Sequence, residues 1–183
     1  MTSRPEVAHP RLSVAAALTL GFGLGMFIDG IVLHQLLQWH HMVSDFESTK
    51  NVGGLKTNTT WDGVFHLSAW LVTAAGAFLL WRSRRSREGP WTMRPFIGLL
   101  LIGWGAFHVV DQVVFHLIVG AHHIRQVDDY QIYDWSFFAI GVAFIIIGWL
   151  LAFAEQDGHA DPRACGILRR RCRRRTWRSS SKQ

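Results

Sequence analysis

The chain has 183 residues, of which 49% are hydrophobic, and yet it carries a formal net charge of +6 at pH 7. This length excludes a large multidomain enzyme, and a mean hydropathy of +0.15 is high for a soluble protein with strongly basic ends. The charged residues gather toward the termini, which leaves a middle that is too apolar for the surface of a water-soluble domain. We therefore expect an integral membrane protein.

Four apolar segments follow one another along the chain, at about residues 13–38, 61–81, 95–119 and 135–154. Each approaches the roughly 20 residues that a helix needs to cross the hydrocarbon layer. Inside lipid only helices and closed barrels satisfy every backbone polar group. The sequence therefore predicts an all-α fold, an integral membrane four-helix bundle over residues 13–155. It lies between an N-terminal tail, 1–12, and a basic tail, 156–183, which we expect to be disordered.

The basic residues predict the orientation of these spans. The two tails and the loop after the second span hold 16 of the 19 Lys and Arg residues, whereas the other two loops hold 3. By the positive-inside rule, both termini face the cytoplasm, and loops 39–61 and 120–134 face outward. The arginine run at 169–175 favours attraction to anionic lipid over nucleic acid as a partner. The sequence does not identify a membrane-protein partner.

The first and third segments share a polar pattern, G-[FW]-G-x5-D-x4-H-x5-H-H, at one constant offset along the chain. The second and fourth match more weakly, with Trp61-Asp62 aligned to Tyr133-Asp134. We therefore expect two repeated two-helix units, related by an axis along the membrane normal. The repeated polar pairs are Asp29 with Asp111, His34 with His116, His40 with His122, and His41 with His123.

The repeated residues also predict a site inside the bundle. On α-helices they occupy one arc of each helix, which should face away from lipid because intramembrane charges are costly. The rise per residue predicts one layer of three histidines, His34, His66 and His116, with Asp29 and Asp111 below it as ligands or as partners of imidazole N–H groups. We expect Asp62 at the rim. An outer layer, about 10 Å away, would form a second site or an access path; its members are His40, His41, His122 and His123.

Several functions are compatible with this pattern. Imidazole and carboxylate ligands suit zinc, iron or copper(II), so the favoured interpretation is a transition-metal site near the outer leaflet with a redox or metal-handling role. A metal-binding membrane protein of this kind could be accessory to a respiratory complex. The sequence contains no recognisable motif of a soluble enzyme. The alternatives are a b-type haem with His34 and His116 as axial ligands, a proton- or ion-conducting transporter, and a purely structural hydrogen-bond network. His108, which has no repeat partner, is either a packing residue or part of the site.

The most specific motif is D-G-I-V-L-H-Q-x-x-x-W-H-H at residues 29–41, together with W-D-G-V-F-H at 61–66 and G-A-H-H at 120–123. These motifs closely resemble a family of bacterial predicted membrane proteins that is classed as a domain of unknown function. The resemblance covers about residues 13–155. It implies a four-span inner-membrane protein and no established activity, and the third span departs from the family pattern at His108 and Gln112.

Overall fold

The structure is a computed structural model that describes residues 11–85 and 92–154. Every regular element in this part of the chain is helical, and two of the α-helices continue into a wider π-helix. The elements are α1 (Arg11–Asp29), the π-helix η1 (Gly30–Leu36), α2 (Val52–Arg85), α3 (Met93–Asp111), the π-helix η2 (Gln112–Ile118) and α4 (Tyr130–Phe153). The predicted tails therefore lie almost wholly outside the described residues.

Within the described ranges, four helical stretches are long and apolar enough to cross a membrane: Ser13–Leu36, Val52–Arg85, Met93–Ile118 and Tyr130–Phe153. This confirms the predicted all-α membrane fold with four spans. Helix α2 begins well before the predicted segment 61–81, because the Asn51 side chain caps its first turn by accepting a hydrogen bond from the Gly54 backbone N–H at 2.8 Å. Polar residues thus extend the helix beyond its apolar part.

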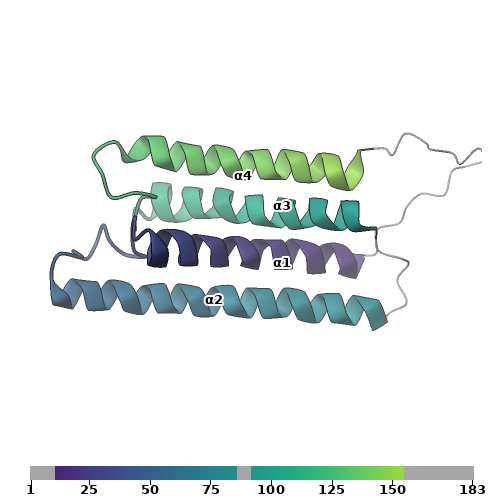
Figure 1. Cartoon of the computed structure of the whole chain (residues 1–183), viewed down its shortest axis with the longest axis horizontal. Coiled ribbons are helices and arrows are strands. Elements are labelled where there is room, and N and C mark those ends of the chain that lie inside the picture. Colours follow the sequence, from purple (N-terminus) through teal and green to yellow (C-terminus); the bar gives the residue numbers. More distant parts are fainter. Residues whose placement is uncertain (1–10, 86–91, 155–183) are drawn as a thin grey trace, which may run out of the picture. The chain divides into compact units, whose positions relative to one another are not determined.

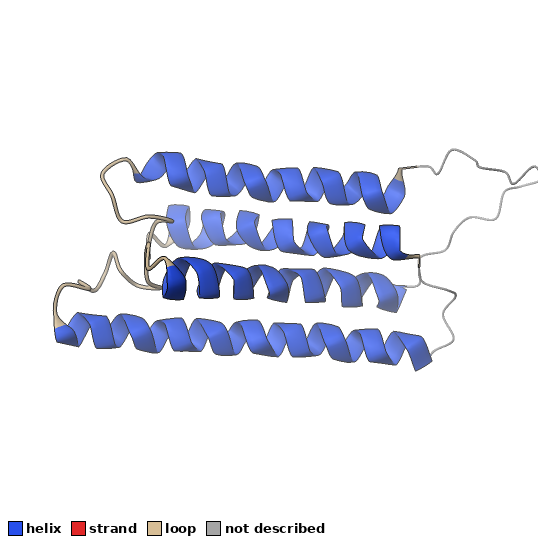
Figure 2. Cartoon of the chain, viewed as in Figure 1, coloured by secondary structure: helices blue, strands red, loops and turns tan. Residues whose placement is uncertain are grey.

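The helices follow the order α2, α1, α3, α4 across the bundle (Figure 1). Helices α1 and α3 pack together at the centre, α2 packs against α1, and α4 packs against α3. Within the described ranges, the backbones of α2 and α3 stay apart, and so do those of α1 and α4. The two loops 37–51 and 119–129 lie at the same end of the bundle (Figure 2). At this end the two loops also contact each other, for example through Gln126 N–H to Trp39 C=O at 3.1 Å.

Glycines allow the two central helices to touch through their backbones. A Cβ atom added at Gly21 of α1 would overlap the backbone carbonyl oxygen of Leu100, and one added at Gly103 of α3 would overlap that of Leu18. These two glycines are counterparts in the repeated pattern. Small residues at helix interfaces permit such close approach in membranes, where packing contacts hold helices together. The α1–α3 contact therefore sets the spacing of everything attached to these helices.

The outward faces of the bundle are apolar. Trp70 and Leu71 of α2 and Ile146 and Trp149 of α4 are each more than half exposed. In water such faces would drive aggregation, whereas in a bilayer they contact hydrocarbon. The exposed surface of these helices therefore implies contact with lipid.

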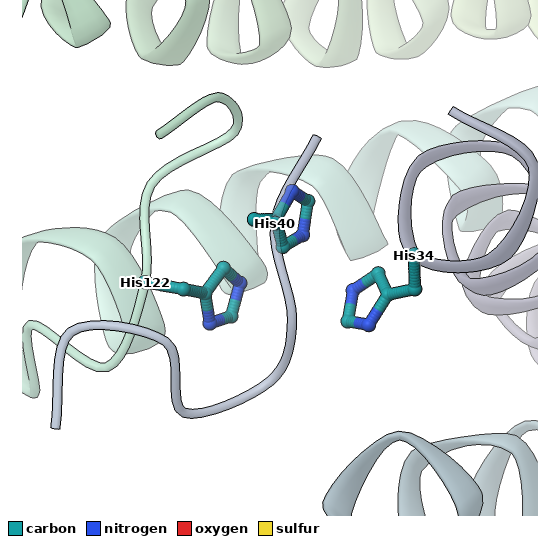
Figure 3. Close-up of side chains that lie close together, drawn as sticks. All are labelled: His34, His40 and His122. Atoms are coloured by element: carbon teal, nitrogen blue, oxygen red, sulfur yellow. The ribbon is translucent and has the colours of Figure 1, made fainter. Parts of the chain in front are cut away.

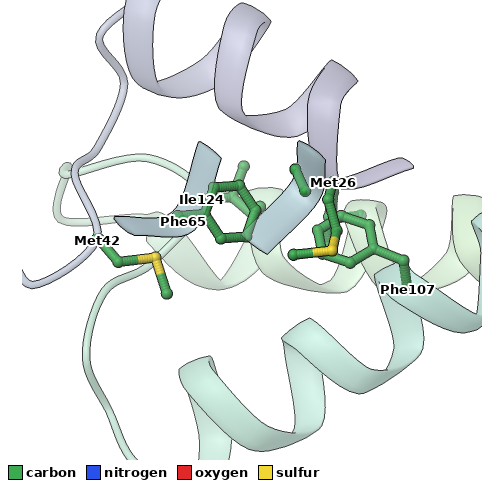
Figure 4. Close-up of a cluster of buried hydrophobic side chains, with 7 residues drawn as sticks. Met26, Met42, Phe65, Phe107 and Ile124 are labelled. Carbon is green, nitrogen blue, oxygen red and sulfur yellow. The ribbon is translucent and has the colours of Figure 1, made fainter. Parts of the chain in front are cut away.

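The largest apolar core lies close to the two loops at one end of the helices (Figure 4). Met26, Phe65 and Phe107 contribute to it from three helices, and Met42 and Ile124 contribute from the two loops. All five are at most 9% exposed. The loops are thus packed onto the helix ends as part of the core, which fixes the polar side chains that neighbour these apolar ones.

Candidate metal centre

Both central helices widen into a π-helix immediately after an aspartate. The π-type hydrogen bonds join residues five apart, as in Leu37 N–H to Val32 C=O at 2.8 Å. Because the backbone closes its turn after five residues, Asp29 comes to lie beside His34, with 3.4 Å between Asp29 Oδ2 and His34 Nε2. The uniform α-helix assumed from the sequence is wrong here, since five residues on an α-helix leave the two side chains about 140° apart.

The other half repeats this local structure. Val119 N–H donates to Val114 C=O at 2.8 Å, and Asp111 Oδ2 lies 3.2 Å from His116 Nε2. Each of these residues is the counterpart of one in the first half, at the offset of the repeated pattern. The equal spacing between aspartate and histidine therefore has the same structural cause in both halves, a π-turn that brings the two side chains together.

After each π-helix the chain reverses through a residue with positive φ. Gln38 has φ 48° and Gly120 has φ 63°, and these two residues are also counterparts in the repeat. The reversal brings His40 and His122 back over the helix ends, so that the His34 and His40 rings lie 4.3 Å apart and the His40 and His122 rings stack at 4.7 Å (Figure 3). The predicted separate outer layer is therefore incorrect for these two histidines.

Four of the described histidines form a continuous series of rings. His34 contacts His40, His40 stacks on His122, and His122 contacts His116 with 4.6 Å between ring centroids. All four side chains are at most 3% exposed. A buried group of four imidazoles in an apolar bundle needs a partner for every ring nitrogen, because unpaired polar atoms in such surroundings are costly.

Carboxylates hold one nitrogen of the two helical histidines. His34 Nδ1 lies 2.8 Å from Asp62 Oδ1, and His116 Nδ1 lies 3.1 Å from Asp134 Oδ1. Both aspartates come from the outer helices α2 and α4 and are at most 4% exposed. With an ionised carboxylate as acceptor, Nδ1 carries the proton and donates, so Nε2 is the nitrogen that is left to face the other rings.

Backbone carbonyls hold the same nitrogen of the two loop histidines. His40 Nδ1 donates to Ile124 C=O at 2.9 Å, and His122 Nδ1 donates to Met42 C=O at 3.1 Å. Each loop therefore fixes the histidine of the other loop. Burial lowers the pKa of His40 well below its usual range and that of His122 to about 4, so both imidazoles are neutral at pH 7.

The second nitrogens remain without a hydrogen-bond partner among the described residues. This holds for Nε2 of each member of the series, His34, His40, His116 and His122. The carboxylates of Asp29 and Asp111 lie near two of these atoms, but outside the geometry of a hydrogen bond. Imidazoles with fixed Nδ1–H groups and free Nε2 lone pairs are the arrangement that metal ions use in proteins.

Among the described residues, three groups of possible ligands have donor atoms within 4.8 Å of one another, and two of them are formed by the central rings. One consists of His34, His40 and His122, and the other of Asp111, His116 and His122. They share His122, which lies where the two halves meet. These buried groups can hold a metal ion.

Asp62 and Asp134 support further groups besides the central imidazoles. Asp62 accepts hydrogen bonds from His41 Nδ1 at 2.6 Å and from the Met42 backbone N–H at 2.9 Å. Asp134 does the same with His123 Nδ1 at 2.7 Å and the Ile124 backbone N–H at 2.9 Å. Each carboxylate thus ties a helical histidine to the loop that covers it.

Asp134 is absent from the site residues predicted from the sequence. Its alignment with Asp62 was the signal that could have found it. Its group with His116 and His123 also has donor atoms within 4.8 Å. We interpret that group as a hydrogen-bond network, because the Asp134 oxygens already accept three N–H groups. His41 and His123 are counterparts in the repeat, and each holds in place the carboxylate to which it donates, Asp62 or Asp134.

Two other histidines lie outside the series of rings. His66 donates through Nδ1 to the carbonyl oxygen of Asp62, at 2.7 Å, and belongs to neither central group. The structure therefore does not form the predicted layer of His34, His66 and His116. His108 accepts from Trp104 Nε1 at 3.1 Å and stacks on Phe137 at 4.0 Å, and its Nδ1 faces the Phe137 carbonyl at 3.3 Å. Both of its nitrogens are occupied, so it is a packing residue.

Residues 16–155 match the sequence profile of a family described as Predicted membrane protein (DUF2243). The chain belongs to this family. The matched range contains all the residues of both central groups, and it agrees with the resemblance found in the sequence motifs. No curated protein and no solved structure matches the chain. The family is one of unknown function, so the chemistry of the site has to come from its geometry.

Proposed function

We propose that this membrane protein binds a transition metal at the four-histidine series, through His34, His40, His116 and His122 with Asp111. The observation that carries the proposal is that four buried Nε2 atoms lack a hydrogen-bond partner while every Nδ1 is fixed by an acceptor. A structural hydrogen-bond network would instead use both nitrogens of each ring, as it does at His108.

The ligand chemistry narrows the choice of ion. Neutral imidazoles and carboxylates suit zinc, iron or copper(II), whereas a copper(I) carrier would use thiolates or thioethers. Met42 packs in the apolar core, and the two cysteines of the chain lie in the basic tail. We propose that the bound ion has a redox or metal-handling role, accessory to a respiratory complex in a bacterial inner membrane.

The ring contacts favour a bare ion over haem. A bis-histidine haem needs its iron, and the plane of the macrocycle, between two axial imidazoles. Here the series of contacts runs from His34 through His40 and His122 to His116, so two further rings occupy the series between the axial candidates. A Soret band in the absorption spectrum of the purified protein would contradict the proposal.

Metal content of the full-length protein, purified in detergent without chelator, tests the proposal. We expect at least one zinc, iron or copper ion per chain by elemental mass spectrometry. His122→Ala should remove all bound metal, because this residue belongs to both central groups. His66→Ala is the matched control, since this half-buried histidine of α2 belongs to neither group, and it should keep the metal.

His122 Nδ1 donates to the Met42 carbonyl, so its one Nε2 lone pair binds a single ion, which the two groups share. His34→Ala and His116→Ala should therefore both lower the affinity for that ion. Wild-type protein that contains no metal, and that also binds none after dialysis against zinc, iron(II) or copper(II), would refute the proposed function. Proton flux in metal-free liposomes would then favour a relay through the same Asp and His residues.

A further inference from the structure

An apolar cavity of about 280 Å³ lies beside the metal centre. Its lining comes from α1, α2, α3, η2 and the first loop, in the region where the backbones of α2 and α3 stay apart. Trp61, Val64 and Val110 line it and are 49%, 46% and 44% exposed. All three belong to the membrane-crossing stretches, so the cavity opens sideways toward lipid.

Two polar side chains, Ser68 and Asp111, line this otherwise apolar cavity, and Asp111 is one of the proposed ligands. Asp111 lines the cavity and is 3% exposed, and its carboxylate oxygen Oδ2 lies 3.2 Å from His116 Nε2 but has no hydrogen-bond partner. The same residue belongs to the group with His116 and His122. A molecule in the cavity could therefore present a hydroxyl group to Asp111 while its body stays in apolar surroundings.

The rest of the lining favours a flat ring. Five aromatic side chains contribute to it, including Phe65, Phe107 and Phe115, and two methionines, Met26 and Met42, supply adaptable thioethers. Aromatic side chains and methionine sulfur pack well against rings. An acyl chain would fill the same volume, but it would leave the Oδ2 atom of Asp111 without a hydrogen bond.

The two halves of the protein differ at this position. In the repeat that aligns His34 with His116, the counterpart of Met26 is His108, and the counterpart of Phe22 is Trp104. These two counterparts hydrogen-bond to each other at 3.1 Å, and His108 stacks on Phe137. In the second half, Trp104 and His108 thus pack with each other and with Phe137, whereas their counterparts in the first half, Phe22 and Met26, line the cavity.

We propose that this cavity binds the hydroxyl-bearing aromatic ring of a lipid-soluble molecule, a phenol or quinol with an apolar chain, which enters from the bilayer between α2 and α3. The ring lies among the aromatic side chains, and its hydroxyl donates a hydrogen bond to Asp111. The binding of this molecule depends only on the cavity. Any role for it as a substrate or ligand of the proposed metal centre rests on the proposed function.

A pair of redox-inert probes tests the binding. 4-Decylphenol and its methyl ether, 4-decylanisole, share an apolar chain and a ring, but only the phenol can donate a hydrogen bond. Their affinities for the full-length protein in lipid nanodiscs can be compared by isothermal titration calorimetry, with empty nanodiscs as the blank. We expect the phenol to bind about 10-fold more tightly, as one buried hydrogen bond to a charged group provides. Equal affinities would overturn the proposal.

Two matched variants locate the bound probe. Val64→Trp places an indole at the mouth of the cavity and should weaken 4-decylphenol binding at least 10-fold. Ser136→Trp introduces the same side chain at the corresponding position of α4, in the alignment of Asp62 with Asp134, and should leave the affinity unchanged. Both positions are exposed, so neither change disturbs packing. Unchanged binding in Val64→Trp would overturn the proposal.

The metal content of the same samples separates this proposal from the proposed function. Val64→Trp should keep the wild-type amount of metal, because Val64 belongs to neither ligand group. A wild-type protein that binds 4-decylphenol selectively but contains no metal would support the cavity and refute the metal site. One that contains metal but does not distinguish the two probes would support the metal site and refute the cavity assignment.

Discussion

At the scale of single residues, the site depends on two carboxylates that organise histidines. Asp62 and Asp134 each accept two imidazole N–H groups and one backbone N–H, and they are almost fully buried. Buried charges are tolerated in proteins when hydrogen bonds satisfy them. By fixing the proton on Nδ1, these residues decide which nitrogen of His34 and of His116 faces the centre.

Asp62→Asn should weaken metal binding about 10- to 100-fold, the usual cost of losing an outer partner of a metal-binding histidine. An amide offers one acceptor oxygen, so its NH2 group would face an imidazole N–H that the carboxylate now accepts. Competition with a chromogenic chelator measures the affinity. Asp128→Asn, in the exposed part of the second loop, is the control and should bind as wild type. Equal affinities in both variants would show that Asp62 does not orient the ligands.

At the scale of elements, two features replace the regular helix end. A π-helix brings each aspartate beside its histidine, and a residue with positive φ then turns the chain back. One half uses Gly120 for this turn and the other uses Gln38, although glycine adopts such a conformation more readily. The reversal is therefore imposed by the contacts of the loops rather than by the preference of that one residue.

Gly120→Ala should lower the free energy of unfolding by about 1–2 kcal/mol, because a Cβ atom is disfavoured at positive φ. Space is not the cause, since nothing lies within 4 Å of the added atom. Gly63→Ala offers the opposite case: it also has open space, but it lies within α2, where alanine should stabilise the helix by about 1 kcal/mol. Denaturant titration in mixed micelles measures both. A loss of stability in both variants, or in neither, would contradict the assignment of the turn.

At the scale of the whole molecule, the contacts occur in pairs. The π-helices, the reversed turns, the Asp–His contacts and the central glycines each recur in the second half at the same offset along the chain. The loops then exchange contacts, since each fixes the histidine of the other through a backbone carbonyl. A two-unit arrangement accounts for such pairing, and the duplication itself stays a prediction of the sequence. The group of His34, His40 and His122 takes its ligands from both halves, whereas Asp111, His116 and His122 all belong to the second half.

The orientation in the membrane stays a prediction as well, and cysteine labelling tests it. We expect Asp128→Cys, made in a chain with Cys165→Ser and Cys172→Ser, to react with a membrane-impermeant maleimide on intact bacteria. The otherwise native chain, which carries Cys165 and Cys172 in its basic tail, should react only after the cells are opened. The reverse pattern would place the histidine end of the bundle on the cytoplasmic side.

The sequence by itself determined the four spans, their polar residues and the pairing of Asp29 with Asp111 and of His34 with His116. Hydrophobic runs and repeated motifs are local signals, and they do not depend on the exact geometry of the backbone. Asp62 was also within reach of the sequence, and its alignment with Asp134 could have added the second carboxylate.

Only the tertiary structure decided which histidines meet. A count of residues at a fixed helical rise placed His40 and His122 in a separate layer and brought His66 into the central one. The structure does otherwise, because the π-helices change the register and each loop folds back to bond a backbone carbonyl in the other half of the chain. Such a register depends on contacts between segments far apart in the chain, which no local periodicity records.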